Sequence, residues 1–135
     1  MTGIEIEQDI YDLVKASPLA SLVNGQVCRK DTRPANSEAE DIIVAHVGGI
    51  DGQVQEGSVN VNCYVKDIDD GSGSLVEDIS RGKVIARAMD ALIRSAYIEN
   101  YELTLDSVIS TYKVQNANQH CVHMGVAYRR TTIND

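Results

Sequence analysis

Apolar residues recur at two distinct periods along this chain, and the two periods separate expected helices from expected strands. The first stretch follows the spacing of one helix face, at Ile6, Ile10, Leu13 and Val14. Acidic residues fill the positions between them, so an amphipathic helix is expected here. Ser17 and Pro18 interrupt this helix and start a short second helical turn, which Asn24 and Gly25 end.

Three strands are expected next. A brief strand around Gln26 to Lys30 leads into a loop, Asp31 to Glu38, whose Pro, Asn, Ser and charged residues leave it no apolar face. The β-branched run Ile42 to Val47 suits a central strand, and Gly48 to Gly52 suits the turn of a hairpin. From Ser58 to Lys66 apolar and polar residues alternate, so one face should meet the core and the other should meet water.

The main helix is expected after an acidic stretch. Asp67 to Gly73 is interpreted as a flexible connector, and Ser74 with Glu77 has the spacing of a capping box that starts a helix. Gly82 inside this helix costs about 1 kcal/mol relative to Ala and suggests close approach to the backbone beneath. The apolar stripe of the helix would be Leu75, Ile79, Ala86, Met89, Leu92 and Ile93.

The last third of the chain returns to the strand pattern. Alternation continues through 103–114, a turn is expected at 115–118, and alternation resumes over 122–128. The element order is then helix, three strands, helix, two strands. Links of hairpin length favour mostly antiparallel pairing with the helices packed on one face of the sheet. The expected fold is therefore α+β, in a single domain covering residues 1–135.

The charge balance narrows the classes of partner. The chain has 20 acidic and 12 basic residues, a net charge of −8 that opposes binding to the phosphates of nucleic acid. It has no Phe and no Trp, so base stacking would depend on six tyrosines. No stretch approaches the roughly 20 apolar residues of a membrane span, and residues 1–5 lack signal-peptide features. We expect a cytoplasmic protein with no specific nucleic-acid or membrane partner.

Zinc and thiol chemistry are the first candidates for a reactive site. The three cysteines are far apart in sequence, at Cys28, Cys63 and Cys121, and are interpreted as buried reduced thiols. His120, Cys121 and His123 come nearest to a zinc motif. In a strand, however, Cys121 and His123 share one face while His120 lies on the other, so His46 and Cys63 would have to complete the site. A metal site is not expected.

Other cofactor and catalytic patterns are weaker. The acidic stretch 67–71 fails the calcium-loop register because Lys66 and Ile68 occupy the first two ligand positions. The same aspartates would repel a phosphate at the following helix. Glu38 and the neighbouring acids at 40–41 have no apolar surroundings to shift a pKa, so a solvated loop is expected. The pattern indicates an assembly or interaction protein without a cofactor, and not an enzyme.

The order of elements resembles the tail terminator or tail completion proteins of long-tailed phages, including the small family of that type whose function is unknown. Relatives often show a proline and an aromatic residue entering the second strand, where this chain has Glu40 and Asp41. The segments that carry the resemblance are 10–14, 17–23, 42–46, 58–65, 83–93 and 122–128.

This resemblance implies a ring, usually sixfold, that caps the completed tail tube, stops its growth and forms the surface that joins the head. A repeated heterologous interface would close the ring, and an acidic channel would let DNA pass. The implied partners are copies of the chain itself, tail tube proteins and head-connector proteins. The implied location is the host cytoplasm during assembly and then the tail–head junction of the virion.

Contacts are expected in the loop before the second strand, in the acidic stretch and near the end of the chain. The residues are Arg33, Glu38, Glu40, Asp67, Asp69, Asp70, Arg129 and Arg130. Two other classes share the same features: a head–tail connector, and an unrelated homo-oligomeric α+β interaction module. An enzyme that uses Cys121 or His123 is a third and more distant alternative.

Overall fold

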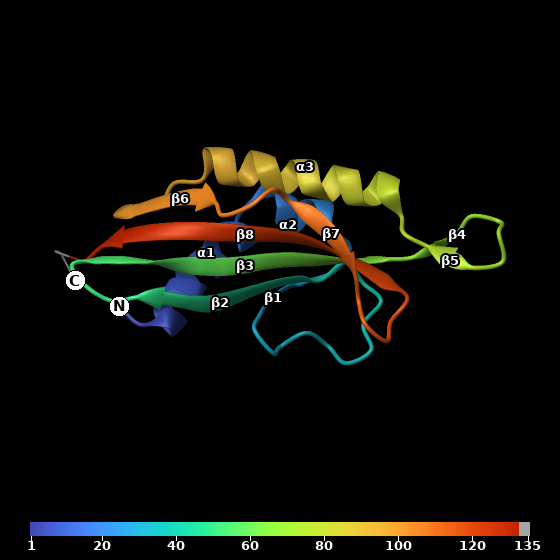
Figure 1. The fold of residues 1–135 in the computed structure, drawn as a ribbon, viewed down its shortest axis with the longest axis horizontal. Coiled ribbons are helices and arrows are strands. Elements are labelled where there is room, and N and C mark those ends of the chain that lie inside the picture. The colour runs from blue at the N-terminus through green and yellow to red at the C-terminus, as the bar shows by residue number, and fades with distance from the viewer. Residues whose placement is uncertain (133–135) are drawn as a thin grey trace.

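The computed structural model describes residues 1–132 as a mixed α+β protein built on a mostly antiparallel sheet (Figure 1). The helices are α1 (Gly3–Lys15), α2 (Pro18–Leu22) and α3 (Ile79–Ser95). The large sheet contains β1 (Val27–Arg29), β2 (Ile42–Ile50), β3 (Val54–Lys66), β6 (Tyr101–Leu105), β7 (Ser110–Lys113) and β8 (Gln119–Thr131). A separate hairpin contains β4 (Ile68–Asp69) and β5 (Leu75–Val76). The predicted fold class is confirmed at this level.

Two long strands form the centre of the large sheet. The strand order is β1-β2-β3-β8-β6, and β7 also pairs with β8. β3 and β8 pair antiparallel from Val54 opposite Thr131 to Lys66 opposite Gln119, without a register shift. β1 and β2 pair in parallel, because the intervening loop returns the chain to the starting end before β2 begins.

The alternation in β3 was predicted correctly, because its apolar residues enter the core and its polar residues are half-buried on the other face. Thr2 caps α1 and forms the capping box with Glu5 that fixes the start of this helix. The three helices and the central strands contribute to one buried cluster, which includes Ile10, Leu19, Val44, Val61, Ile85, Met89 and Met124. Each large aliphatic side chain buried in this way contributes about 1.5–3 kcal/mol. Within residues 1–132, no helix combines the length and apolar character needed to cross a bilayer.

The main helix begins later than predicted. Ser74 and Glu77 do not cap it; Asp78 is the N-cap, and its carboxylate accepts a hydrogen bond from the Arg81 backbone N–H at 3.1 Å. Leu75 is in strand β5 and not on the helix stripe. The competing structure is the β4–β5 hairpin, which uses Leu75 and its neighbour for strand pairing and so prevents the helix from extending backward.

Two strand boundaries also differ from prediction. β2 continues through the two glycines to Ile50, with a register shift between His46 and Gly48, so the turn of the hairpin lies at 51–53. The expected continuous strand over 103–114 is broken between β6 and β7. At this break the Asp106 backbone N–H donates to the Gly125 carbonyl at 3.0 Å, and the Asp106 carboxylate occupies the space where a side chain at position 125 would lie.

Gly82 offers a test of helix packing. The sequence predicted that the backbone beneath α3 approaches the helix closely at Gly82, and the structure does not show this approach. Gly82 is buried in α3, yet an added Cβ would meet no atom within 4 Å outside the local backbone of the helix. The substitution Gly82→Ala should therefore raise the free energy of unfolding by about 0.5–1 kcal/mol, as measured by urea denaturation. The control Gly57→Ala, which places a methyl group against the Gly48 backbone carbonyl of the neighbouring strand, should lower it. A destabilised Gly82→Ala variant would contradict this account of α3.

Candidate functional site

The β4–β5 hairpin forms a short arm that projects beyond the end of the large sheet. In Figure 1 it lies at the opposite end of the molecule from the N-terminus, past the last residues of β3 and before α3 begins. Ile68 pairs with Val76, and Asp69 pairs with Leu75. We refer to residues 68–76 as the arm. It is a paired hairpin, and not the flexible connector expected from the sequence.

Side-chain hydrogen bonds to the backbone shape the tip of the arm. Asp69 Oδ1 accepts from the Gly71 N–H at 2.8 Å, and Asp70 Oδ1 accepts from the Ser72 N–H at 2.9 Å. Gly71 and Gly73 both have φ of +89°, a conformation that favours glycine over residues with a Cβ. The acidic residues of the arm therefore have a structural role in its turn, as well as giving it negative charge.

Apolar side chains at the base of the arm are exposed to water. Ile68 is 43% exposed, Leu75 is 48% exposed, and Ile79 in the adjoining first turn of α3 is 60% exposed. Large aliphatic residues gathered on a projecting element are typical of a surface that binds another protein. They contribute little to the fold of the isolated chain, because they lie outside its buried cluster.

Asp67 anchors the first strand of the arm to the body of the protein. It immediately precedes β4, is 3% exposed, and its N–H donates to the Asn118 carbonyl at 2.9 Å. Lys113 Nζ lies 2.8 Å from its Oδ2, and His120 Nδ1 lies 2.7 Å from its Oδ1. Burial acts to raise the pKa of Asp67, but the hydrogen bonds from Lys113 and His120 outweigh it and hold the pKa below its usual value.

His120 connects both strands of the arm to β8. While its Nδ1 contacts Asp67 before β4, its Nε2 lies 3.8 Å from Glu77 Oε1, just after β5. The ring is largely buried, at 19% side-chain exposure. Contacts on both ring nitrogens restrict the direction in which the arm leaves the sheet. The arm is therefore a positioned element.

The loop before β2 is also fixed by a buried carboxylate. Asp41 is 1% exposed and accepts hydrogen bonds from Arg33 Nε at 2.9 Å, from the Ser37 hydroxyl at 2.5 Å and from the Gln26 N–H at 3.0 Å. The Arg33 guanidinium also lies 3.9 Å from the centroid of the Tyr64 ring. Although burial alone would raise the pKa of Asp41, these hydrogen bonds lower it below its usual value.

Glu40 joins the same loop to the main helix. Its two carboxylate oxygens each lie 2.7 Å from a nitrogen of Arg81, in the bidentate geometry that gives strong ion pairs. The hydrogen bond from Arg81 is the main cause of a lowered pKa at Glu40, against the opposing effect of burial. Glu40 is 7% exposed. The prediction that residues 40–41 form a solvated face is therefore wrong, because distant arginines pair with both carboxylates.

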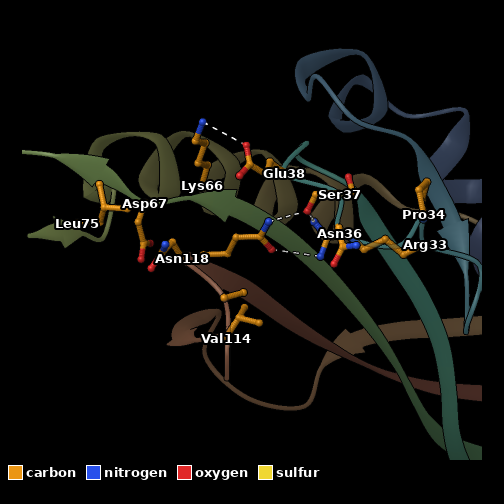
Figure 2. A pocket seen from close by; sticks show the side chains of 12 residues that line it. Arg33, Pro34, Asn36, Ser37, Glu38, Lys66, Asp67, Leu75, Val114 and Asn118 are labelled. Carbon is orange, nitrogen blue, oxygen red and sulfur yellow. Dashed lines mark hydrogen bonds and ion pairs between the residues drawn. The ribbon is translucent and has the colours of Figure 1, made fainter.

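A polar pocket of about 420 Å³ lies between this loop and the arm. Figure 2 shows Leu75 and Asp67 at one end of it, Arg33 and Pro34 at the other, and Glu38 with Lys66 between them. The charged lining groups are already engaged: Arg33 with Asp41, Asp67 with Lys113, and Lys66 with Glu38 at 3.4 Å. The pocket is therefore better described as a boundary of the arm than as a site for a small ligand.

The cysteines and histidines do not assemble a reactive centre. His46 Nε2 lies 2.8 Å from the Tyr128 hydroxyl, and His123 Nδ1 lies 2.6 Å from Asn62 Oδ1. Among the residues that the structure describes, no group of three or more His, Cys, Asp and Glu side chains could hold a metal ion. Burial raises the pKa of Cys121 to about 11, and all three thiols are buried. Thiolate formation is disfavoured in such surroundings.

The structure separates the predicted contact residues into two groups. Most of them lie at the end of the sheet that carries the arm: Arg33, Glu38, Glu40, Asp67, Asp69 and Asp70. Arg129 and Arg130 lie near the opposite end of β8. Arg129 forms a surface ion pair with Glu56 at 3.2 Å, and Arg130 is 6% exposed, with its guanidinium 5.5 Å from the Tyr101 ring centroid.

Four contributors to the arm region were not identified as such from the sequence. Lys113 and His120 fix the arm, but they are separated from Asp67 by 46 and 53 residues, and no local pattern links them. Ile68 and Leu75 flank the acidic stretch symmetrically, and two apolar positions around a Gly-rich turn are the hairpin signal that could have identified the arm.

Loss of the Arg33 ion pair should destabilise the protein. Arg33→Met leaves Asp41 buried with one of its charged partners removed, which should lower the free energy of unfolding by about 2–4 kcal/mol in urea denaturation. Arg94→Met is the matched control, because Arg94 pairs only with Asp90 on the exposed surface of α3. Its effect should stay within about 0.5 kcal/mol. Equal losses for the two variants would contradict the assigned role of Arg33.

The buried carboxylates also predict a pH dependence. Glu40, Asp41 and Asp67 have pKa values lowered by folding, from ordinary values of 4.5 for Glu and 3.8 for Asp. Their contribution to stability is complete above these ordinary values and is lost as pH falls through the lower folded values. The free energy of unfolding should therefore drop between about pH 5 and pH 2. Asp67→Asn should show a shallower drop than the wild type over this range; an unchanged slope would exclude Asp67 as a contributor.

Comparison with known proteins gives no functional assignment. No protein-family model matches the chain, and no curated protein matches it. A solved protein structure is similar to it with 22% sequence identity and a TM-score of 0.49, over 96% of this chain and 93% of the other.

Proposed function

We propose that this protein is a structural phage protein that completes or terminates the tail tube as a self-associating ring and forms the interface with the head. The single observation that carries self-association is the arm, a positioned projection with exposed apolar side chains at its base. The connection with tails depends on the resemblance in the order of helices and strands. The two arguments are independent and can be tested separately.

The arm suits a docking element for physical reasons. Its direction is restricted by contacts of His120 with Asp67 and Glu77, so little conformational freedom is lost on binding. Ile68 and Leu75 would leave water on binding, which is the main favourable term in protein association. In this proposal the arm meets a different surface on its neighbour, and repeated contacts of this kind close into a ring when the rotation between subunits closes.

The arrangement of helices and sheet fits a ring subunit. In this proposal the three helices lie on one face of the sheet, and its other face, with Asn60 and Asn62, remains open. The net charge of −8 would let DNA pass through the ring without adhering. The protein would be present in the host cytoplasm during assembly and at the tail–head junction of the virion afterwards. Tail tube and head-connector proteins would be its partners.

Self-association through the arm can be tested in the purified protein. Ile68→Ser combined with Leu75→Ser removes the exposed apolar surface of the arm without entering the core. We expect the oligomer to dissociate to monomer in sedimentation velocity measurements, with at least a tenfold weaker association, while the circular dichroism spectrum stays unchanged.

Val108→Ser is the matched control, because Val108 is 85% exposed but lies in the connection between β6 and β7. It should leave the oligomer intact. An arm variant that assembles like the wild type, or a wild type that remains monomeric at every concentration, would refute self-association through the arm.

Tail completion requires a test in the phage. Deletion of the gene should give overlong or irregular tails without heads in electron micrographs, because nothing would stop growth of the tube. Tails of normal length that fail to join heads would instead indicate the connector role. Normal virions would end the proposal.

A further inference from the structure

The outer face of α3 carries several positive side chains in this acidic protein. Its buried stripe includes Ile85 and Met89, and the residues on the opposite side of the helix are exposed. Because residues three, four and seven apart share a helix face, that side carries Lys83, Arg87, Asp90 and Arg94 in one row, with Val84 beside Arg87. Val84 is 45% exposed, so the row combines positive charge with apolar surface.

Lys83 and Arg87 differ from most cations of the chain in having no acidic partner. Within residues 1–132, neither forms an ion pair or a side-chain hydrogen bond, whereas Arg94 pairs only with Asp90 on the same helix. Elsewhere most of the cations are paired with a carboxylate, namely Arg29, Arg33, Lys66, Arg81, Lys113 and Arg129. The α3 row therefore has charge that the monomer leaves uncompensated.

The arm has the complementary character. Residues 68–76 include two exposed acids, Asp69 and Asp70, and no basic residue. Leu75 pairs with Asp69 and so shares its face of the hairpin, which places exposed apolar surface beside the acid as Val84 lies beside the cations of α3. With about 3.3 Å per residue, each two-residue strand of the arm is roughly 7 Å long, which is close to the rise of about 6 Å between Lys83 and Arg87 on a helix.

The arm does not reach its own α3 row. Figure 1 shows it leaving the molecule at the end where α3 begins and extending away from the helix. The arm can therefore meet this row on a second copy of the chain. Docking of one copy onto the next would use two different surfaces, which gives a head-to-tail contact that can close into a ring.

We infer that the arm of one copy binds the outer face of α3 of the next, with Asp69 and Asp70 against Lys83 and Arg87, and Leu75, which shares a face of the hairpin with Asp69, against Val84. This inference rests on the proposed self-association and specifies the surface that receives the arm. Complementary charge at such a contact determines which surfaces pair and in what orientation. Exposed ion pairs are screened by salt, so the oligomer should weaken as ionic strength rises.

A charge exchange tests the pairing. The double variant Asp69→Lys with Asp70→Lys should lower the association constant at low salt by at least tenfold. The double variant Lys83→Glu with Arg87→Glu should lower it by a similar factor. A mixture of the two variants should assemble again, because the positive arm fits the negative helix and the reverse contact is also complementary. Native mass spectrometry should then show equal numbers of the two variants in each oligomer.

A matched control reverses the charge of two cations that lie outside α3. Lys15→Glu with Lys30→Glu replaces two exposed cations that lie outside α3 and should leave assembly unchanged. If Lys83→Glu with Arg87→Glu assembles like the wild type, the α3 contact is wrong while self-association through the arm stands. If the wild type never assembles, both the α3 contact and self-association through the arm are refuted. Circular dichroism establishes that each variant is folded.

Disulfide trapping gives a second measurement that does not depend on charge. Ser72→Cys at the arm tip with Val84→Cys on α3 should give covalently linked multimers on oxidation, because the native thiols are buried. Ser72→Cys with Val108→Cys should remain largely unlinked under the same conditions. Equal linking in both pairs would show random collision and would contradict the assigned contact.

Discussion

β3 and β8 pair over all thirteen residues of each strand, and the position of every functional element depends on this ladder. Because side chains alternate between the faces of a sheet, the register determines which residues enter the core. A slip of one residue would move Val61 and Met124 from the core to the opposite face. The same register places His120, at the start of β8, beside Asp67 at the end of β3. The direction of the arm is thus a consequence of strand pairing.

Ion pairs to buried carboxylates join separate parts of the chain at the end of the sheet that carries the arm. Arg33 comes from the loop, Arg81 from α3 and Lys113 from β7, and each pairs with a buried carboxylate on or next to a central strand. Removing a charge from water is unfavourable unless a partner compensates it. These pairs therefore favour one arrangement of the loop, helix and edge strand.

The sequence was most informative where the pattern is local and repeated. The alternation over 58–66 identified β3, its core face and its polar face correctly, because both depend only on neighbouring residues. The start of the main helix was wrong because Ser74 and Glu77 satisfy a local capping pattern that hairpin pairing overrides. The burial of Glu40 could not be predicted, since its partner Arg81 lies 41 residues away. Part of the candidate site depends on such distant pairs.

The break between β6 and β7 has a further consequence for the behaviour of the protein in concentrated solution. Two short strands, offset by the corner at Asp106 and Gly125, form the outer border of the sheet on the β8 side. A long, straight border of unpaired peptide groups would be a template for strand addition and fibril growth. The corner divides that border into segments of five and four residues. The divided border therefore makes uncontrolled strand addition at this edge of the sheet less favourable.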